Sequence, residues 1–299
     1  MNLDNARKNL ASTNPDTLAK SLYLIGKFGK LPDLTTVLTF AKHAAPQVRT
    51  ASVTAASELI RGNLIAHFHE LEPQVRQKLG TIMETLDPPV IDDIVKDLYC
   101  DDNDRRVRAI QILGLLKKNP KIRELLASLV QDRNEKIRAT AVNLLGRIVG
   151  PEDQEIVLSL LNDKDKRVRA NTVEALEAVG NKKIVPILIR FRKDPNNRIR
   201  GNVLKALFIL GFTDIEEDIL GMLQNADNFM RASGLWVVSK IKIVSPKIED
   251  LAGFYLISDN QMVYNNACSA LKSLDTPRSR GYLRYLDKVE PGQQVATAL

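Results

Sequence analysis

Three histidines and two cysteines are the side chains best suited to nucleophilic or metal chemistry, and their settings argue against both. His67 and His69 in HFH lie two residues apart, so on a helix their imidazoles diverge. Cys100 precedes three acidic residues, which disfavour its thiolate. That stretch, CDDND, lacks the ligand positions and closing glutamate of a calcium loop. We therefore expect no catalytic residue, no metal and no cofactor.

Composition and motifs narrow the class of protein further. The chain has 299 residues, of which 44% are hydrophobic and 5% aromatic, and it carries a net charge of +7. The motifs GxxxxGK[ST], GxGxxG and GxSxG are absent from the sequence, so an enzyme is the less favoured class. The positive charge suits an acidic partner but is too dispersed to indicate nucleic-acid binding. With no secretory signal and no apolar stretch long enough to span a membrane, we expect a cytoplasmic protein.

The elements that position all these side chains are set by an internal repeat with a period of about 31 residues. Each copy has an Asp or Asn, an arginine six positions later, a small residue and then an apolar stripe. An aspartate on the loop and an arginine on the next turn can form charge-assisted hydrogen bonds between successive repeats. The expected structural ladder consists of Asp102, Arg108, Asp132, Arg138, Asp163, Arg169, Asp194, Arg200 and Arg231.

Each copy predicts a pair of helices. Apolar residues three or four positions apart, such as Val168, Val173 and Leu176, form a helical stripe after the arginine. The residues four positions before the arginines are expected N-caps, namely Asp104, Asn134, Asp165, Asn196 and Asp227. Glycines that follow the stripe are expected left-handed C-caps, namely Gly150, Gly180 and Gly211.

The aspartate, the Val-Arg dipeptide and the small residue after it resemble HEAT repeats. The short period is similar to that of HEAT-like units in bacterial and phycobilin-lyase-type proteins. This resemblance covers roughly residues 15–275 and implies an all-α solenoid, a right-handed superhelix of about eight helix pairs. We expect one domain over residues 1–299, with an N-terminal cap at 1–30, repeats at 31–275, and a C-terminal cap and flexible tail at 276–299.

Residues two, five and nine positions after each arginine should point away from the apolar stripe and form the exposed face. Trp236, the only tryptophan, occupies such a position, as do Lys205 and Lys240 in their copies. Ile110 and Leu113 give a second apolar spot on the same face. Aromatic side chains on a concave surface are frequent binding residues, although Trp236 can equally serve as packing in the less regular C-terminal layers.

A column of cations stands two positions before the arginines. Its members are Arg106, Lys136, Arg167 and Arg198. A positive charge in the first turn of a helix opposes the helix dipole, so its recurrence suggests a binding rim. The alternative is a solvated edge balanced by the loop acids.

These features favour a non-catalytic scaffold that binds an acidic protein through its concave face and basic rim. Two other functions stay open, because HEAT arrays also serve as lyases and DNA-repair enzymes. A phycobilin-lyase-like protein would hold a tetrapyrrole with the basic residues and Trp236. A DNA-binding array like the alkyl-purine glycosylases would need an acidic residue and aromatics around a cleft, and the sequence does not show such a set.

Overall fold

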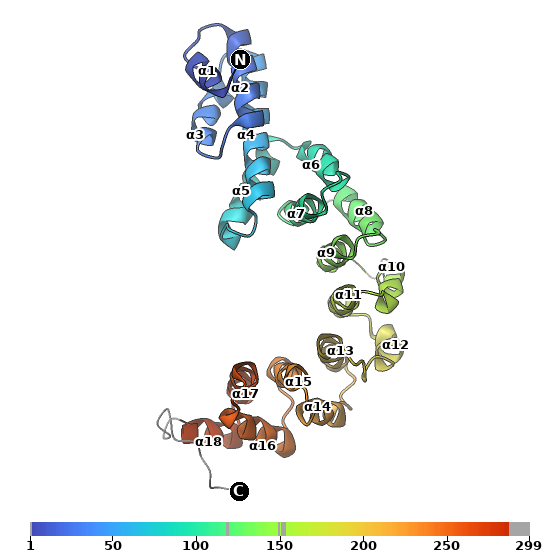
Figure 1. The fold of residues 1–299 in the computed structure, drawn as a ribbon. Helices are drawn as coiled ribbons and strands as arrows, with labels where there is room; N and C mark the ends of the chain where they lie inside the picture. The colour runs from blue at the N-terminus through green and yellow to red at the C-terminus, as the bar shows by residue number, and fades with distance from the viewer. Residues whose placement is uncertain (1, 118–119, 149, 151–153, 287–299) are drawn as a thin grey trace. The chain divides into compact units, whose positions relative to one another are not determined.

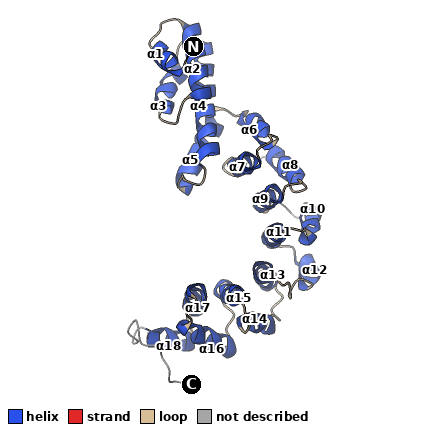
Figure 2. Cartoon of the chain, viewed as in Figure 1, coloured by secondary structure: helices blue, strands red, loops and turns tan. Residues whose placement is uncertain are grey.

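The computed structural model describes residues 2–117, 120–148, 150 and 154–286, and over these residues Figure 2 shows helices and loops without a strand. The chain divides into two compact units, residues 1–148 and 149–299, which are described separately. One continuous right-handed array over residues 1–299 therefore stays a prediction. The predicted flexible tail falls largely on residues 287–299, which lie outside the described part of the chain.

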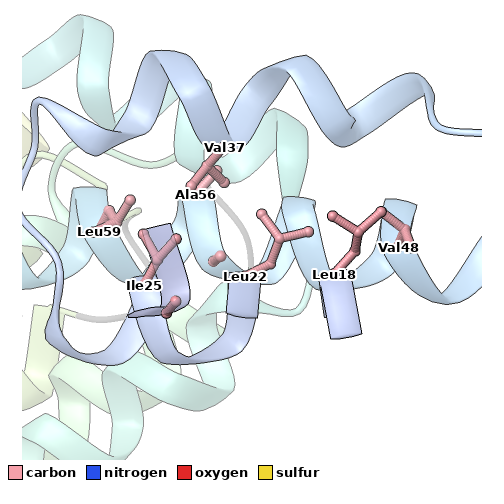
Figure 3. Close-up of a cluster of buried hydrophobic side chains, with 9 residues drawn as sticks. Leu18, Leu22, Ile25, Val37, Val48, Ala56 and Leu59 are labelled. Atoms are coloured by element: carbon pink, nitrogen blue, oxygen red, sulfur yellow. The ribbon is translucent and has the colours of Figure 1, made fainter. Parts of the chain in front are cut away.

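The first unit is built from helices that follow one another in antiparallel pairs (Figure 1). Its helices are α1 (Leu3–Asn9), α2 (Pro15–Phe28), α3 (Asp33–Leu38), η1 (Thr39–Lys42), α4 (Pro46–His67), α5 (Pro73–Leu86), α6 (Val90–Leu98), α7 (Asn103–Leu113), α8 (Pro120–Leu129) and α9 (Glu135–Leu145). Figure 3 shows the core of its N-terminal end, where Leu18, Leu22 and Ile25 of α2 face side chains of α3 and α4. These aliphatic contacts bury the stripe that the sequence pattern places on one side of each helix.

The second unit repeats the same two-layer plan. Its helices are α10 (Gln154–Ser159), η3 (Leu160–Asn162), α11 (Lys166–Val179), η4 (Lys182–Ile184), α12 (Val185–Ile189), α13 (Asn197–Ile209), α14 (Glu216–Leu223), α15 (Asn228–Ile241), α16 (Pro246–Phe254), η5 (Tyr255–Ile257), α17 (Gln261–Leu274) and α18 (Pro277–Leu286). Within this unit α11, α13, α15 and α17 form the inner row in Figure 1, and α12, α14 and α16 form the outer row. Stacked pairs of this kind confirm the expected all-α solenoid.

The loops before α9, α11, α13 and α15 share one hydrogen-bonding scheme. In each loop the first Asp or Asn accepts the N–H two residues later, as Asp163 Oδ1 does from Asp165 at 2.8 Å. Asp165 then caps the helix by accepting the N–H groups of Arg167 and Val168. The predicted N-caps Asn134, Asp165, Asn196 and Asp227 are confirmed. Each cap satisfies backbone donors that the first turn would leave unpaired.

Arg138, Arg169 and Arg231 close their loops through main-chain oxygens, whereas Arg200 donates to Asp218 O at 3.2 Å. Arg169 Nη1 donates to the carbonyls of Asp163 and Lys164 at 2.8 and 3.2 Å. Arg138 makes the same two contacts with the carbonyls of Asp132 and Arg133. In these copies the loop aspartate offers its arginine a carbonyl, while its carboxylate caps the turn. A guanidinium has enough donors to hold two adjacent carbonyls at once.

The copy that begins at Asp102 departs from the predicted alignment by two residues. Asp102, not Asp104, is the N-cap of α7, so Arg106 takes the repeat-arginine position. Its guanidinium pairs with the carboxylate of Asp132 in the next repeat and donates to Leu98 O. Arg108, the expected ladder member, instead donates to Ile65 O at 2.9 Å. The ion pair that links repeats therefore exists here, but it joins Arg106 to the following copy.

The helix ends fit the C-cap prediction in two of three places. Gly180 and Gly211 adopt left-handed conformations with φ of 71° and 96°. α9 ends earlier than predicted, at Leu145, so Gly150 is not its C-cap. In the two later repeats, Lys242 and Asp275 hold the left-handed C-cap position, with φ of 54° and 52°.

Gly26 marks the closest approach between α2 and α4. A Cβ at this position would lie 2.7 Å from Ala55 Cα, which is too close for two carbon atoms. Gly62, inside α4, has open space around it. The two glycines thus occupy the same packed pair of helices with opposite steric surroundings.

None of the described helices is both long enough and apolar enough to cross a bilayer.

We predict that Asp163→Ala lowers the free energy of unfolding by about 1–2 kcal/mol, because the loop loses an acceptor for the Asp165 N–H. Urea unfolding followed by circular dichroism measures this change. The matched control is Lys164→Ala, an exposed side chain in the same loop, which should change stability by less than about 0.5 kcal/mol. An unchanged unfolding midpoint for Asp163→Ala contradicts the structural role of the loop.

Gly26→Ala should destabilise the protein by about 1–3 kcal/mol, because α2 and α4 must separate to admit the methyl group. Gly62→Ala should be neutral or stabilise by up to about 1 kcal/mol, since alanine favours a helix interior. Thermal unfolding of both variants tests the pair. Equal effects at the two positions would show that the close approach at Gly26 is absent.

Candidate functional site

The exposed face of the inner row in the second unit carries Trp236 at its centre. Trp236 lies on α15 and is half-buried. The Nζ of Lys205, on the neighbouring α13, sits 5.4 Å from the centroid of the Trp236 ring. The same ammonium is 3.1 Å from Glu177 Oε1 on α11. A cation between a ring and a carboxylate links three successive inner helices and restrains the indole.

The Glu177 side chain is largely buried. Burial raises the pKa of its carboxyl, and the neighbouring Lys205 ammonium acts in the opposite direction. Its Oε2 atom is buried and has no hydrogen-bond partner within the described part of the chain. Sequence reasoning missed Glu177, because it lies outside the positions two, five and nine after the arginine. The only available signal was its place on a helix next to that of Lys205.

Beside Trp236, two exposed side chains extend the face by one helical turn. Ile209 follows Lys205 on α13 and is 55% exposed. Lys240 follows Trp236 on α15 and is also exposed. Residues four apart share one side of a helix, so these four side chains form a single patch. We call Lys205, Ile209, Trp236 and Lys240 the tryptophan patch.

A partly buried polar network lies beside the patch, toward the N-terminal ends of α11 and α13. Asn202 Nδ2 donates to Ala170 O at 3.1 Å and to Glu174 Oε1 at 2.7 Å. Arg198 donates to Asn171 Oδ1 and to the same Glu174 oxygen. Asn171 and Asn202 stand two positions after Arg169 and Arg200, where the repeat pattern predicts an exposed side chain, yet both are buried and join adjacent helices. Hydrogen bonds to partners on the next helix make this burial tolerable.

The second apolar spot predicted for the exposed face is wrong. Ile110 and Leu113 have relative exposures of 0% and 1%, so they belong to the core of the first unit. The reason is the two-residue shift of this copy. Relative to Arg106 they stand four and seven positions on, where Val142 and Leu145 stand relative to Arg138, and those residues are also buried.

The predicted basic rim is largely neutralised by nearby acids. In the first unit Arg106 pairs with Asp132, and Lys136 Nζ lies 3.5 Å from Asp104 Oδ1. In the second unit Arg167 pairs with Asp165 at 3.0 Å and Arg198 with Glu174 at 3.1 Å. Since Arg106 also closes the repeat, the four residues do not form one equivalent column. The Arg106–Asp132 pair is largely buried, and the three more exposed pairs contribute little energy.

The residues best suited to catalysis have local structural contacts. His43 Nδ1 accepts the N–H of Ala45, and His67 Nδ1 lies 2.9 Å from Glu70 Oε2. Cys100 and Cys268 are free thiols at half-buried positions. Over the described ranges, His, Cys, Asp and Glu do not gather in groups of three that could hold a metal ion. That the chain is not an enzyme stays a prediction.

Comparison with known proteins gives a family model and several solved structures. Residues 91–165 and 154–239 match the model for HEAT repeats. A search of curated proteins finds no match. Kap95p, which binds RanGDP, has a TM-score of 0.50 at 14% identity, and the match covers 95% of this chain and 46% of Kap95p.

Two bacterial structures are similar over more of their own length. YibA of Escherichia coli is 20% identical with a TM-score of 0.48, and the match covers 86% of this chain and 87% of YibA. The CpcE and CpcF complex of phycocyanin lyase from Nostoc sp. PCC7120 gives 15% identity and a TM-score of 0.48. That match covers 76% of this chain and 93% of the matched chain in the complex. The family match, together with the loop geometry that the copies share, shows that this chain is a HEAT-repeat protein.

Proposed function

We propose that the protein is a non-catalytic scaffold that binds another protein through the inner face of its second unit. The observation that carries this proposal is the half-buried Trp236 ring, which Lys205 restrains on an exposed face. A large ring already held in place loses little conformational entropy on binding. Partner binding then buries the rest of the indole together with Ile209, which gives an apolar centre to the interface.

The solenoid fold supports a protein as the partner. Each layer offers only a few outward side chains, so a ligand must bridge several layers to bury enough surface. The tryptophan patch already spans α13 and α15, and Glu177 adds α11 beneath it. Kap95p, which shares the fold, binds the protein RanGDP.

The charges around the patch favour an acidic partner. Lys205 is engaged by Glu177, and Arg167 and Arg198 have their own acids. Lys240 is exposed beside the ring and is the cation of the patch best placed to meet a carboxylate. The net charge of +7 acts in the same direction at long range.

A non-catalytic role and a cytoplasmic location are part of the same proposal. The contacts of His43 and His67 with Ala45 and Glu70 support a structural use of both imidazoles. The free thiols of Cys100 and Cys268 are suited to a reducing compartment.

Trp236→Ala should weaken partner binding by about 30-fold at any salt concentration, because a central buried tryptophan contributes about 2 kcal/mol. Affinity capture identifies partners retained by wild type and lost by the variant, and calorimetry then gives Kd. Wild-type fluorescence reports the face directly, since Trp236 is the only tryptophan. The control is Tyr99→Ala, an exposed aromatic of the first unit, which should bind normally. If Trp236→Ala instead lowers Tm by many degrees and leaves affinity intact, the ring is only packing.

Lys240→Glu should slow association about 10-fold at low salt, and the effect should fade as salt rises, because exposed charges steer encounter. Stopped-flow fluorescence of Trp236 measures the rate with the partner found above. Lys78→Glu, which makes the same charge change on exposed α5, is the matched control. Equal slowing by both variants would mean that net charge, and not the tryptophan patch, attracts the partner.

A further inference from the structure

The outer face of α2 carries exposed side chains along its central turns within the first unit. Leu18, Leu22 and Ile25 bury the opposite side of the helix against α3 and α4. Tyr23 on the outer side is 60% exposed although its ring is large and mostly apolar. One exposed aromatic is ordinary on a protein surface, so what matters here is the pattern of side chains around Tyr23.

Four exposed side chains form a straight stripe along this face. Asp16, Lys20, Tyr23 and Lys27 follow at intervals of four, three and four residues, and all four are exposed. This spacing keeps side chains on one side of a helix over three turns. The two ends of the stripe carry opposite charges, with a carboxylate at the N-terminal end and an ammonium at the C-terminal end.

A shallow hollow lies at the middle of the stripe. Ala19, Lys20, Tyr23 and Leu24 line it, and its surface is almost entirely apolar. The small side chain of Ala19 leaves room beside the Tyr23 ring. The face therefore offers a projecting ring and a recess of apolar character next to each other.

We propose that this face binds a second copy of the chain, with the two α2 helices antiparallel. If the two-fold axis passes between the levels of Ser21 and Leu22, Asp16 of one copy faces Lys27 of the other. At the same level Lys20 faces Tyr23, and the Tyr23 ring lies on the same side of the interface as Ala19 of the other copy. Each pairing occurs twice, because a two-fold interface places the same patch on both subunits.

The chemistry of these pairs is complementary throughout. Asp16 and Lys27 form two ion pairs at the ends, and the Lys20 ammonium meets the Tyr23 ring in a cation–π contact. Each Tyr23 ring enters the apolar hollow beside Ala19 of the other copy. Lys27 Nζ, now 6.0 Å from the centroid of its own Tyr23 ring, is already close to the interface. Each of the four side chains in the stripe thus meets a complementary group on the second copy.

A nucleic acid fits this face less well. The aromatic and lysine side chains could stack on bases and contact phosphates, but Asp16 would repel the backbone at one end of the stripe. The side chains that line the apolar hollow give a phosphate only two donor groups, the Lys20 ammonium and the Tyr23 hydroxyl. One helix face per copy buries less than the roughly 800 Å² per partner of a stable complex, so the dimer should be weak and reversible.

A charge-swap experiment tests the proposal on the full chain. Sedimentation velocity between about 1 and 200 µM should show wild type in a monomer–dimer equilibrium, and Tyr23→Ala should be monomeric. Asp16→Lys and Lys27→Asp should each raise the dimer Kd at least ~10-fold, because each places like charges opposite one another. The double variant Asp16→Lys/Lys27→Asp should restore dimerisation to within ~3-fold of wild type, since both ion pairs re-form with reversed polarity.

The matched control swaps an ion pair elsewhere, Asp93→Lys with Lys96→Asp on α6, and should leave the dimer unchanged. Circular dichroism melting confirms that each variant is folded. Three results overturn the proposal: a wild type that is monomeric at 200 µM, single variants that dimerise normally, or a folded double variant that stays monomeric. A labelled 20-nucleotide single strand, added to wild type, must not bind in a Tyr23-dependent way. Trp236→Ala should dimerise like wild type, because Trp236 lies outside the α2 face. A failure of the dimer proposal therefore leaves the scaffold proposal intact.

Discussion

The capped loop before each inner helix is the constraint on which the rest of the structure depends. An Asx side chain sets the residue at which the helix begins, and Arg138 and Arg169 each hold two carbonyls of the preceding loop. Once that first residue is set, the period of 3.6 residues decides which side chains enter the core and which reach the surface. The loop therefore determines the register of a whole layer, and the position of Trp236 follows from Asp227 nine residues earlier.

The sequence is sufficient to predict the solenoid and four of the five caps, because these depend on local chemistry that recurs in each copy. It fails in the copy that begins at Asp102, where two aspartates and two arginines, each two residues apart, offer alternative registers. The structure chooses Asp102 with Arg106, because the Arg106 guanidinium then reaches Asp132 of the next repeat. Ile110 and Leu113 move into the core as a result. Local patterns do not contain that contact with the next repeat.

The candidate site shows the same division between local and non-local information. Exposure of Lys240 follows from its helix position alone. Burial of Asn202 does not, because it depends on Ala170 and Glu174 of another helix. A polar residue at an outward position is thus buried where the adjacent helix supplies hydrogen-bond partners, and it is solvated where that helix supplies none. For this reason the network beneath Trp236, including Glu177, becomes visible only when α11, α13 and α15 are packed together.

The left-handed residue that ends the inner helices bears on how such arrays diverge. Gly180 and Gly211 take this conformation without steric strain, but they leave the unfolded chain more freedom to lose. Lys242 and Asp275 accept about 1–2 kcal/mol of strain in the folded state and restrict the unfolded chain more. The two effects oppose each other, so a change between glycine and another residue has a small net effect on stability. Duplicated repeats can therefore drift at this position almost neutrally, and a lineage can diversify the edge of its array without first compensating in the core.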